Sequence, residues 1–462
     1  AFEILIQDEQ ERLGNLLREM EHLVPADQIP AHLQLIGQAL ELISPEDEPL
    51  LWAQLLYKAG HYLTASPGGD PLDNADAAIH AFDTARQVLT PQLDPALWAG
   101  MMQSLGDAYL HRGRGERGDN LDQAIAAYRE ALQALSPEQA LGPWVDVQLN
   151  LALAYVERPW GDRDDNLERA IEACQLVLQP VSPEEMPVQW ATAQHELGNA
   201  YSRRVQGDRA DNLEMAIDAY QQALRVFTQE QMPYQWAATM DSLGQVYRRR
   251  LRGERAGNLE RALAAHTAAL EVRTPQETPI EWARSMRGLA IAYGQRIQGD
   301  PAENMERAIA AFQAALAVYD REDRPLQWAA TMSNLGDSYA SRIGGDPAEN
   351  MEQAITAYSA ALEILSPETQ PGLWHHTTSH LAESYLAREG GQRLENVDRA
   401  IDAYEALLQS QTWQAEPKAR GETLADLAGA RLERAQAGHP QDYEPAIEAY
   451  LAAAEVISRE DN

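Results

Sequence analysis

Hydrophobic residues along this chain fall into paired helical stretches. Residues 187–227 begin with Trp190, Leu197 and Tyr201, whose spacings of seven and four residues place them on one face of a helix. A second apolar stripe with helical spacing follows and consists of Ala216, Ile217, Tyr220, Ala223 and Leu224. The segment therefore predicts two helices joined by a turn.

This pair of helices recurs along nearly the whole chain with a period of 46 residues. Its clearest marker is a tryptophan, found at Trp52, Trp98, Trp144, Trp190, Trp236, Trp282, Trp328 and Trp374. A leucine, an asparagine and an arginine recur at the same step, from Leu105 to Leu427, from Asn74 to Asn396 and from Arg112 to Arg434. A fixed period of this size is typical of a solenoid, whose units pack only on their neighbours. We expect an all-α, right-handed superhelical solenoid of about ten helix-turn-helix units.

The copies divide the 462 residues into three stretches of a single solenoid. Residues 1–47 form a divergent first copy, in which Ile6 occupies the tryptophan position. Residues 48–416 hold eight regular copies, beginning near Pro49, Pro95, Pro143, Pro187, Pro233, Pro279, Pro325 and Pro371. Residues 417–462 form a divergent last copy, in which Arg420 replaces the tryptophan. We see no linker or second domain between them.

Local signals mark the helix ends within one copy. Pro187 suits the first position of a helix, where its missing N–H costs nothing. Gly207 follows the first helix and suits the left-handed conformation just beyond its end. Asp211 and Glu214 predict a capping pair at the start of the second helix.

Composition narrows the function classes. The formal net charge is −34, with 71 acidic and 37 basic residues, which argues against nucleic acid as a general partner. The single cysteine, Cys174, excludes a disulfide framework and fits a cytoplasmic protein. No apolar run approaches the roughly 20 residues of a membrane span, and no secretory leader opens the chain. The first residue is Ala1 rather than Met, which suggests a fragment or a processed form.

The repeated motif resembles the tetratricopeptide repeat (TPR). The Leu-Gly-x-x-Tyr pattern of that family matches the segments 197–201 and 335–339, and its later Ala, aromatic and Ala match Ala216, Tyr220 and Ala223. The family period is about 34 residues, and its tryptophan lies about three residues before the leucine rather than seven. The longer form is similar to repeat arrays of cyanobacterial and other bacterial multidomain proteins, where CHAT protease or signalling-ATPase domains accompany them. The resemblance implies a protein-binding groove.

Two aromatic features allow more than one interpretation. The tryptophan series is either a buried staple between copies or an exposed aromatic ladder, and its place on the Leu–Tyr stripe favours the staple. Trp160 lies off register in a turn, where it is either a contact anchor or an incidental loop residue.

Basic residues also follow the repeat. The arginine that closes each first helix is expected to pair with a loop carboxylate four residues later, as Asp208 follows Arg204. A denser group is either a solvated helix end or a receptor for an anionic partner, and consists of Arg248, Arg249, Arg250, Arg252 and Arg255.

Candidate chemistry is sparse. His376 and His380 lie one turn apart on a predicted helix, with Glu383 close by, and two histidines at that spacing can share a metal ion. The spacing arises easily by chance, so we expect no metal and no cofactor. No nucleophile–base pair or phosphate-binding loop stands out, and we expect no enzymatic activity.

The copies differ most at polar positions opposite the apolar stripe of the first helix. In TPR arrays this face lines the peptide-binding groove, although solvent-facing positions also drift freely. The groove residues predicted to contact a partner are His195, Asn199, Asp241, Gln245, Arg284, Arg287, Asn334, Asp337, His376 and His380.

We therefore expect a scaffold or sensor module that binds a protein or peptide as part of a larger regulatory protein. The alternative is a structural protein that assembles end to end into filaments. The apolar residues predicted to form the assembly ends are Phe2, Ile6, Ile447, Tyr450 and Ile457. A groove for a small molecule is a weaker third hypothesis.

Overall fold

The computed structural model describes the backbone of residues 2–22, 28–66, 68–159, 161–390, 392–410 and 417–460. Side chains are described within these segments from residue 9 to residue 457, Pro417 excepted. The described segments are α-helical, with one short 3₁₀ helix and no strand, as the sequence predicts. The chain divides into two compact units, Ala1–Thr228 and Gln229–Asn462, each containing ten α-helices in its described part.

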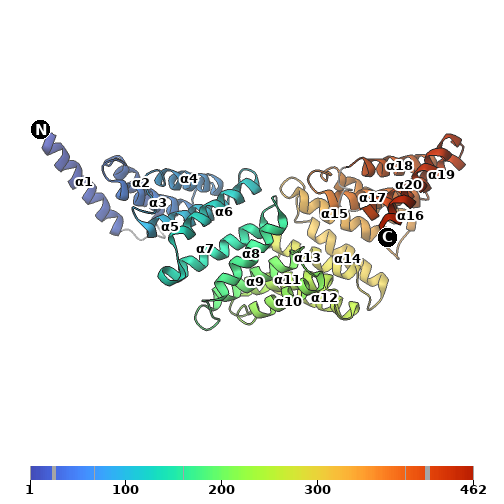
Figure 1. Ribbon diagram of the computed structural model, residues 1–462, viewed down its shortest axis with the longest axis horizontal. Coiled ribbons are helices and arrows are strands. Elements are labelled where there is room, and N and C mark those ends of the chain that lie inside the picture. The colour runs from blue at the N-terminus through green and yellow to red at the C-terminus, as the bar shows by residue number, and fades with distance from the viewer. Residues whose placement is uncertain are drawn as a thin grey trace. The chain divides into compact units, whose positions relative to one another are not determined.

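Five helical hairpins make up each unit (Figure 1). The N-terminal unit contains α1 (Phe2–His22), α2 (Ile29–Leu40), α3 (Pro49–Ala65), α4 (Pro71–Ala85), α5 (Pro95–Leu110), α6 (Arg117–Ala134), α7 (Pro137–Glu157), α8 (Arg163–Leu178), α9 (Pro187–Arg203) and α10 (Arg209–Ala223). The C-terminal unit contains α11 (Pro233–Arg249), α12 (Arg255–Val272), α13 (Pro279–Gly294), α14 (Pro301–Leu316), α15 (Pro325–Ala340), α16 (Pro347–Leu362), α17 (Pro371–Ala387), α18 (Arg393–Gln409), α19 (Pro417–Gln436), η2 (Pro440–Asp442) and α20 (Tyr443–Glu460).

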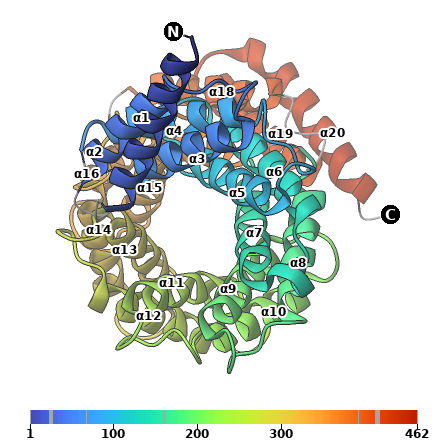
Figure 2. The ribbon, with the colours of Figure 1, turned by 90° about the vertical axis from the view of Figure 1, so that its left-hand side faces the viewer.

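The hairpins stack so that the first helices lie next to one another. Within the N-terminal unit α3, α5, α7 and α9 contact in sequence, and within the C-terminal unit α11, α13, α15 and α17 do the same. Each second helix packs against its own first helix and against the next one within its unit. Figure 2 shows this layering inside each unit, for example with α6, α8 and α10 covering one side of α5, α7 and α9. We call the opposite, uncovered side the first-helix face.

Proline and aspartate set most helix starts. Pro187 is the first residue of α9, as predicted, and the matching prolines open the other regular first helices except α7. That helix starts at Pro137 instead of near Pro143, and the non-helical Ala140 divides it. The cap of α10 also differs from the prediction, because Asp208 rather than Asp211 accepts the N–H of the first turn.

The glycine of the inter-helix turn adopts the predicted left-handed backbone. Gly207 has φ +79°, and the same glycine in the turns from residue 69 to residue 345 has φ between +77° and +82°. It lies one residue before the cap Asp208, not directly after the first helix, which closes at Arg204. Gly391 lies outside the described residues.

A tight contact between the two helices explains the Leu-Gly motif. A Cβ on Gly198 would lie 2.7 Å from the ring of Tyr220, and one on Gly336 would lie 2.6 Å from the ring of Tyr358. The glycine therefore lets the aromatic residue of the second helix rest on the backbone of the first. This contact brings the two helices of the hairpin close together.

The tryptophan series does not form an exposed ladder, and the staple is the interpretation that the burial favours. Trp144 and Trp190 are buried and the other members are half-buried, none of them exposed. Trp328 packs against the apolar core around Ala315 and Tyr319 of its preceding hairpin and against the core around Ala361 of its own. Cys174 is buried as well, in the position that Tyr220 fills in the next hairpin. Trp160 lies outside the described residues.

The arginine ladder pairs with a different partner from the one predicted. Arg204 lies 2.6 Å from Glu168, a carboxylate 36 residues earlier on the second helix of the preceding hairpin. The same spacing joins a carboxylate to Arg112, Arg158, Arg296, Arg342, Arg388 and Arg434. The same arginine also donates to the asparagine eight residues later, as Arg204 does to Asn212. That asparagine in turn donates to a carbonyl of the turn, Gln206 in this case. The spacing of four residues to Asp208 was misleading because Asp208 caps the next helix.

Candidate functional site

The structure divides the predicted groove residues into exposed and internal ones. Arg284 is exposed, and most of the others are half-buried on the first-helix face of their unit. Asp241 is different, with only 1% of its side chain exposed. It therefore belongs to the interior of the C-terminal unit and is not presented to a partner.

At one variable position of the groove, the residue type depends on the aromatic residue in the core of the same hairpin. In three hairpins a tyrosine of the second helix donates to a side chain 21 residues earlier on the first helix: Tyr128 to Asp107 at 2.6 Å, Tyr220 to Asn199 at 2.7 Å and Tyr358 to Asp337 at 2.8 Å. Where the second helix carries Phe312, the matching residue is Ile291. The sequence shows this relation as a correlation, within one copy, between the aromatic position of the second helix and the position 21 residues earlier on the first helix. Variation at this position therefore reports internal packing as well as any partner.

Asp241 is the centre of a buried ionic network. Its carboxylate accepts from His266 Nδ1 at 2.9 Å and lies 3.3 Å from Arg284 Nε and 3.5 Å from Arg273 Nη1. Burial alone would raise the pKa of Asp241, but the hydrogen bond from His266 and the charges of His266, Arg284 and Arg273 outweigh it and hold that pKa well below its usual range. The network fixes α11, α12 and α13 to one another.

Two further arginines on α11 and α13 lack a counterion. Arg248 lies on the same face of α11 as Asp241, two turns later, and Arg287 lies on α13 one turn after Arg284. The described residues offer neither side chain an ion pair, and the Nε atom of Arg287 is buried without a hydrogen-bond partner. Burial and the nearby charges of Arg249, Arg255 and Arg287 lower the pKa of Arg248 to about 10. We call Arg248 and Arg287 the basic site.

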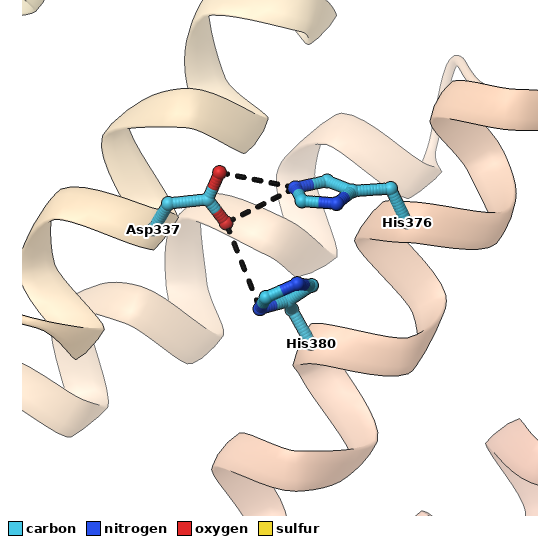
Figure 3. Close-up of side chains that lie close together, drawn as sticks. All are labelled: Asp337, His376 and His380. Atoms are coloured by element: carbon cyan, nitrogen blue, oxygen red, sulfur yellow. Dashed lines mark hydrogen bonds and ion pairs between the residues drawn. The ribbon is translucent and has the colours of Figure 1, made fainter. Parts of the chain in front are cut away.

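A second cluster joins α15 to α17 (Figure 3). His376 Nε2 lies 3.0 Å from Asp337 Oδ2, and His380 Nδ1 lies 3.8 Å from Asp337 Oδ1. The hydrogen bond to Asp337 raises the pKa of His376, although burial opposes this. The sequence placed the two histidines together but did not identify Asp337 as their neighbour, because that contact crosses between hairpins.

A cavity of about 350 Å³ lies in the N-terminal unit beside His61 and Ser104. Ser104 Oγ is 3.2 Å from His61 Nε2, but the same nitrogen is 2.9 Å from the hydroxyl of Tyr57. Asp107, the nearby carboxylate, is held by Tyr128 and Asn150 instead of orienting the imidazole. The geometry is not that of a serine–histidine–aspartate relay.

The last helix carries an exposed apolar stripe. Ile447, Tyr450 and Leu451 are exposed, with Leu451 at 66%, and Ile457 is exposed at 39%. The equivalent residues of α10, Ile217 and Tyr220, are buried. The assembly role of this stripe remains a prediction, and the side chains of Phe2 and Ile6 lie outside the described residues.

The comparisons with known proteins give no family assignment. No protein-family model matches the sequence, and no curated protein matches it. Similar solved structures include the APC/C hetero-tetramer Cut9–Hcn1 (14% identity over 94% of this chain and 93% of that chain, TM-score 0.37) and a human IFIT1 dimer with m7Gppp-AAAA (15% identity, 93% and 100%, TM-score 0.37). A third is the P58(IPK) TPR domain (14% identity, 88% and 99%, TM-score 0.22). Likeness at this level carries no inference about function.

No helix in the described part of the chain is both long enough and apolar enough to span a membrane.

Proposed function

We propose that this chain is a protein- or peptide-binding scaffold or sensor module that works within a larger regulatory protein in the cytoplasm. Its first-helix face binds the partner, and the basic site binds an acidic segment of that partner. The observation that carries the proposal is the pair Arg248 and Arg287, two half-buried cations without a counterion. The single cysteine, Cys174, is free, as is usual for proteins of the reducing cytoplasm.

The charge balance around the basic site favours an anionic ligand. Asp241 supplies one internal negative charge, which Arg273 and Arg284 already contact. Arg248 and Arg287 add positive charge that the described neighbours do not neutralise, in a chain whose net charge is −34. Carboxylates accept two parallel hydrogen bonds from guanidinium groups, so an Asp- or Glu-rich peptide is the matching partner.

The test measures binding of a fluorescein-labelled hexaglutamate peptide by anisotropy, beside a hexaglutamine peptide. The parent chain should bind the acidic peptide in preference, and Arg248→Gln with Arg287→Gln should weaken that binding about tenfold or more, since hydrogen bonds to charged groups contribute about 1.5–3 kcal/mol each. Arg307→Gln is the matched control, because Arg307 is exposed and paired with Glu303 on α14.

Equal binding of both peptides, or unchanged binding by the double variant with helicity intact, would contradict an acidic partner at this site. Binding of a single-stranded oligonucleotide in place of the peptide would also contradict it.

The exposed stripe of α20 favours a second candidate, a structural protein that self-assembles end to end. An apolar surface that joins a different surface of another copy propagates into filaments unless the rotation closes a ring. Sedimentation of the parent beside a Tyr450→Glu, Ile457→Glu variant tests this. Assembly predicts large particles for the parent and monomers for the variant, whereas identical sedimentation of the two would dismiss the filament.

A further inference from the structure

We propose that Asp337, His376 and His380 bind one divalent transition-metal ion of the zinc and cobalt class on the first-helix face of the C-terminal unit. The ligand atoms come from two adjacent first helices, α15 and α17, and point toward one another (Figure 3). Such a site lies outside the basic site and does not depend on it.

The distances suit a shared ion. Two ligand atoms about 2.1 Å from a tetrahedral ion lie about 3.4 Å apart. Asp337 Oδ1 lies 3.3 Å from His376 Nε2 and 3.8 Å from His380 Nδ1, on either side of that value. All three ligand atoms fall within 4.8 Å of one another. Small side-chain rotations therefore suffice to place an ion between them.

The ligand types select the metal class. Two imidazoles and one carboxylate favour Zn²⁺, Co²⁺ and related ions, whereas Mg²⁺ and Ca²⁺ favour oxygen ligands. Three protein ligands leave at least one coordination position for water or for a group of a partner. The side chains are accessible for loading, since His376 and His380 are 42% and 40% exposed and Asp337 is 32% exposed.

A buried hydroxyl orients the carboxylate. Tyr358 of α16 donates to Asp337 Oδ1 at 2.8 Å, which leaves Oδ2 toward His376. Outer hydrogen bonds of this kind fix ligand carboxylates in metal sites. Glu383 Oε2 is 3.8 Å from His380 Nδ1, so a further carboxylate lies beside the three residues.

The chain contains a natural counterpart in which the histidines are replaced. Five repeats earlier, Asp107, Asp146 and Asn150 occupy the positions of Asp337, His376 and His380. Tyr128 donates to Asp107 there as Tyr358 does to Asp337, and Asn150 closes the contact between the helices with a hydrogen bond of 2.8 Å. The substitution His376→Asp with His380→Asn therefore imports a side-chain set that this fold already accommodates.

The experiment titrates Zn²⁺ into tag-free, chelator-treated chain by calorimetry and records the visible spectrum with Co²⁺. The parent should bind one ion per chain and give Co²⁺ d–d bands, and Zn²⁺ should raise its melting temperature. His376→Asp with His380→Asn should weaken binding at least tenfold and abolish the bands, while circular dichroism stays that of the parent.

A reciprocal variant keeps the test decisive if the first one unfolds. Asp146→His with Asn150→His should give the N-terminal unit a second ion of similar affinity. Unchanged stoichiometry and affinity in a folded His376→Asp, His380→Asn variant would overturn the proposal, as would a parent that binds no Zn²⁺ at micromolar concentration.

Discussion

The contact between α5 and α7 and the contact between α15 and α17 are built on the same positions but end in different chemistry. Both place an aspartate two residues after the leucine of the motif and hold it with a tyrosine hydroxyl from the second helix. In the N-terminal unit the next first helix contributes Asn150, which donates a hydrogen bond to that aspartate. In the C-terminal unit the next first helix contributes two histidines, which lie beside the aspartate. A repeated backbone can therefore change a hydrogen-bonded contact into a ligand set by replacing two side chains.

The electrostatics of the two contacts differ accordingly. Burial raises the pKa of Asp107 against the hydrogen bonds of Tyr128 and Asn150. Burial and the charge of Asp107 also raise the pKa of Asp146. At the second contact, His376 faces the carboxylate and its own pKa is raised by that hydrogen bond. The first contact concentrates negative charge, whereas the second balances it.

The shared glycine should be equally indispensable at both contacts. A Cβ on Gly106 would lie 2.5 Å from the ring of Tyr128, and one on Gly336 would lie 2.6 Å from Tyr358. Gly106→Ala and Gly336→Ala should each lower the free energy of unfolding by about 3 kcal/mol, because the buried ring must move. Urea denaturation measures this loss.

Gly257→Ala on α12 is the control, since no atom lies within 4 Å of its added Cβ and alanine favours a helix by about 0.5–1 kcal/mol. If one of the two core glycines tolerates alanine as well as Gly257 does, the two contacts do not share one packing.

Glu196 offers a third version of the contact, in the position of Asn150 and His380. Leu153 stands where the other contacts have an aspartate, and burial raises the pKa of Glu196 to about 7 despite a hydrogen bond from Asn199. A carboxyl whose pKa is raised on folding contributes most stability below its unfolded pKa, and this contribution is lost as pH rises from about 4.5 to 7.

Glu196→Gln should therefore match the parent in stability near pH 4 and exceed it by about 2–3 kcal/mol at pH 8. Denaturant titrations of both proteins across this pH range isolate the effect, because all other titrating groups are common to them. A constant difference between the two proteins at every pH would show that Glu196 ionises normally.

The sequence predicts the repeat architecture well because local rules determine it. The period, the opening prolines such as Pro187 and the turn glycines such as Gly207 are all set within one hairpin. Contacts between hairpins are not visible in a single copy. For this reason the prediction assigned Asp208 to Arg204 in place of Glu168, and it did not connect His376 and His380 with Asp337 of the preceding hairpin. Asp241 was placed in an open groove because the buried His266 and Arg273 lie on and after a different helix.

Removing the hydroxyl of Tyr128 should lower the free energy of unfolding by less than adding a Cβ to the glycine does. Tyr128→Phe removes one of the two hydrogen bonds that Asp107 Oδ1 accepts, and Asp107→Ile leaves both donors, Tyr128 and Asn150, unpaired, so each variant should cost about 1–2 kcal/mol. The double variant should recover part of that loss, because Phe312 and Ile291 already occupy these two positions in the C-terminal unit, whereas Asn150 still lacks its acceptor. A double-mutant cycle by urea denaturation measures the coupling. Additive losses would mean that the two residues vary independently.

The smallest effect is expected at the arginine ladder, which both regions share. Arg158 closes α7 and reaches Asp122, and Arg388 closes α17 and reaches Glu352. The two arginine side chains are 27% and 23% exposed and the two carboxylate side chains 36% and 45% exposed, so water and salt screen both pairs.

Arg158→Gln and Arg388→Gln should each lower the free energy of unfolding by about 0.5–1 kcal/mol at low salt, and by less at 1 M NaCl. Arg169→Gln is a suitable control, because its pair with Asp165 lies within one helix and joins no hairpins. Unlike the first-helix contacts, these two rungs share the same kinds of residue, because each arginine also donates to an asparagine eight residues later, Asn166 for Arg158 and Asn396 for Arg388. Unequal losses at Arg158 and Arg388 would show that even this uniform element depends on its unit, and the difference between α5–α7 and α15–α17 would then extend beyond the two exchanged side chains.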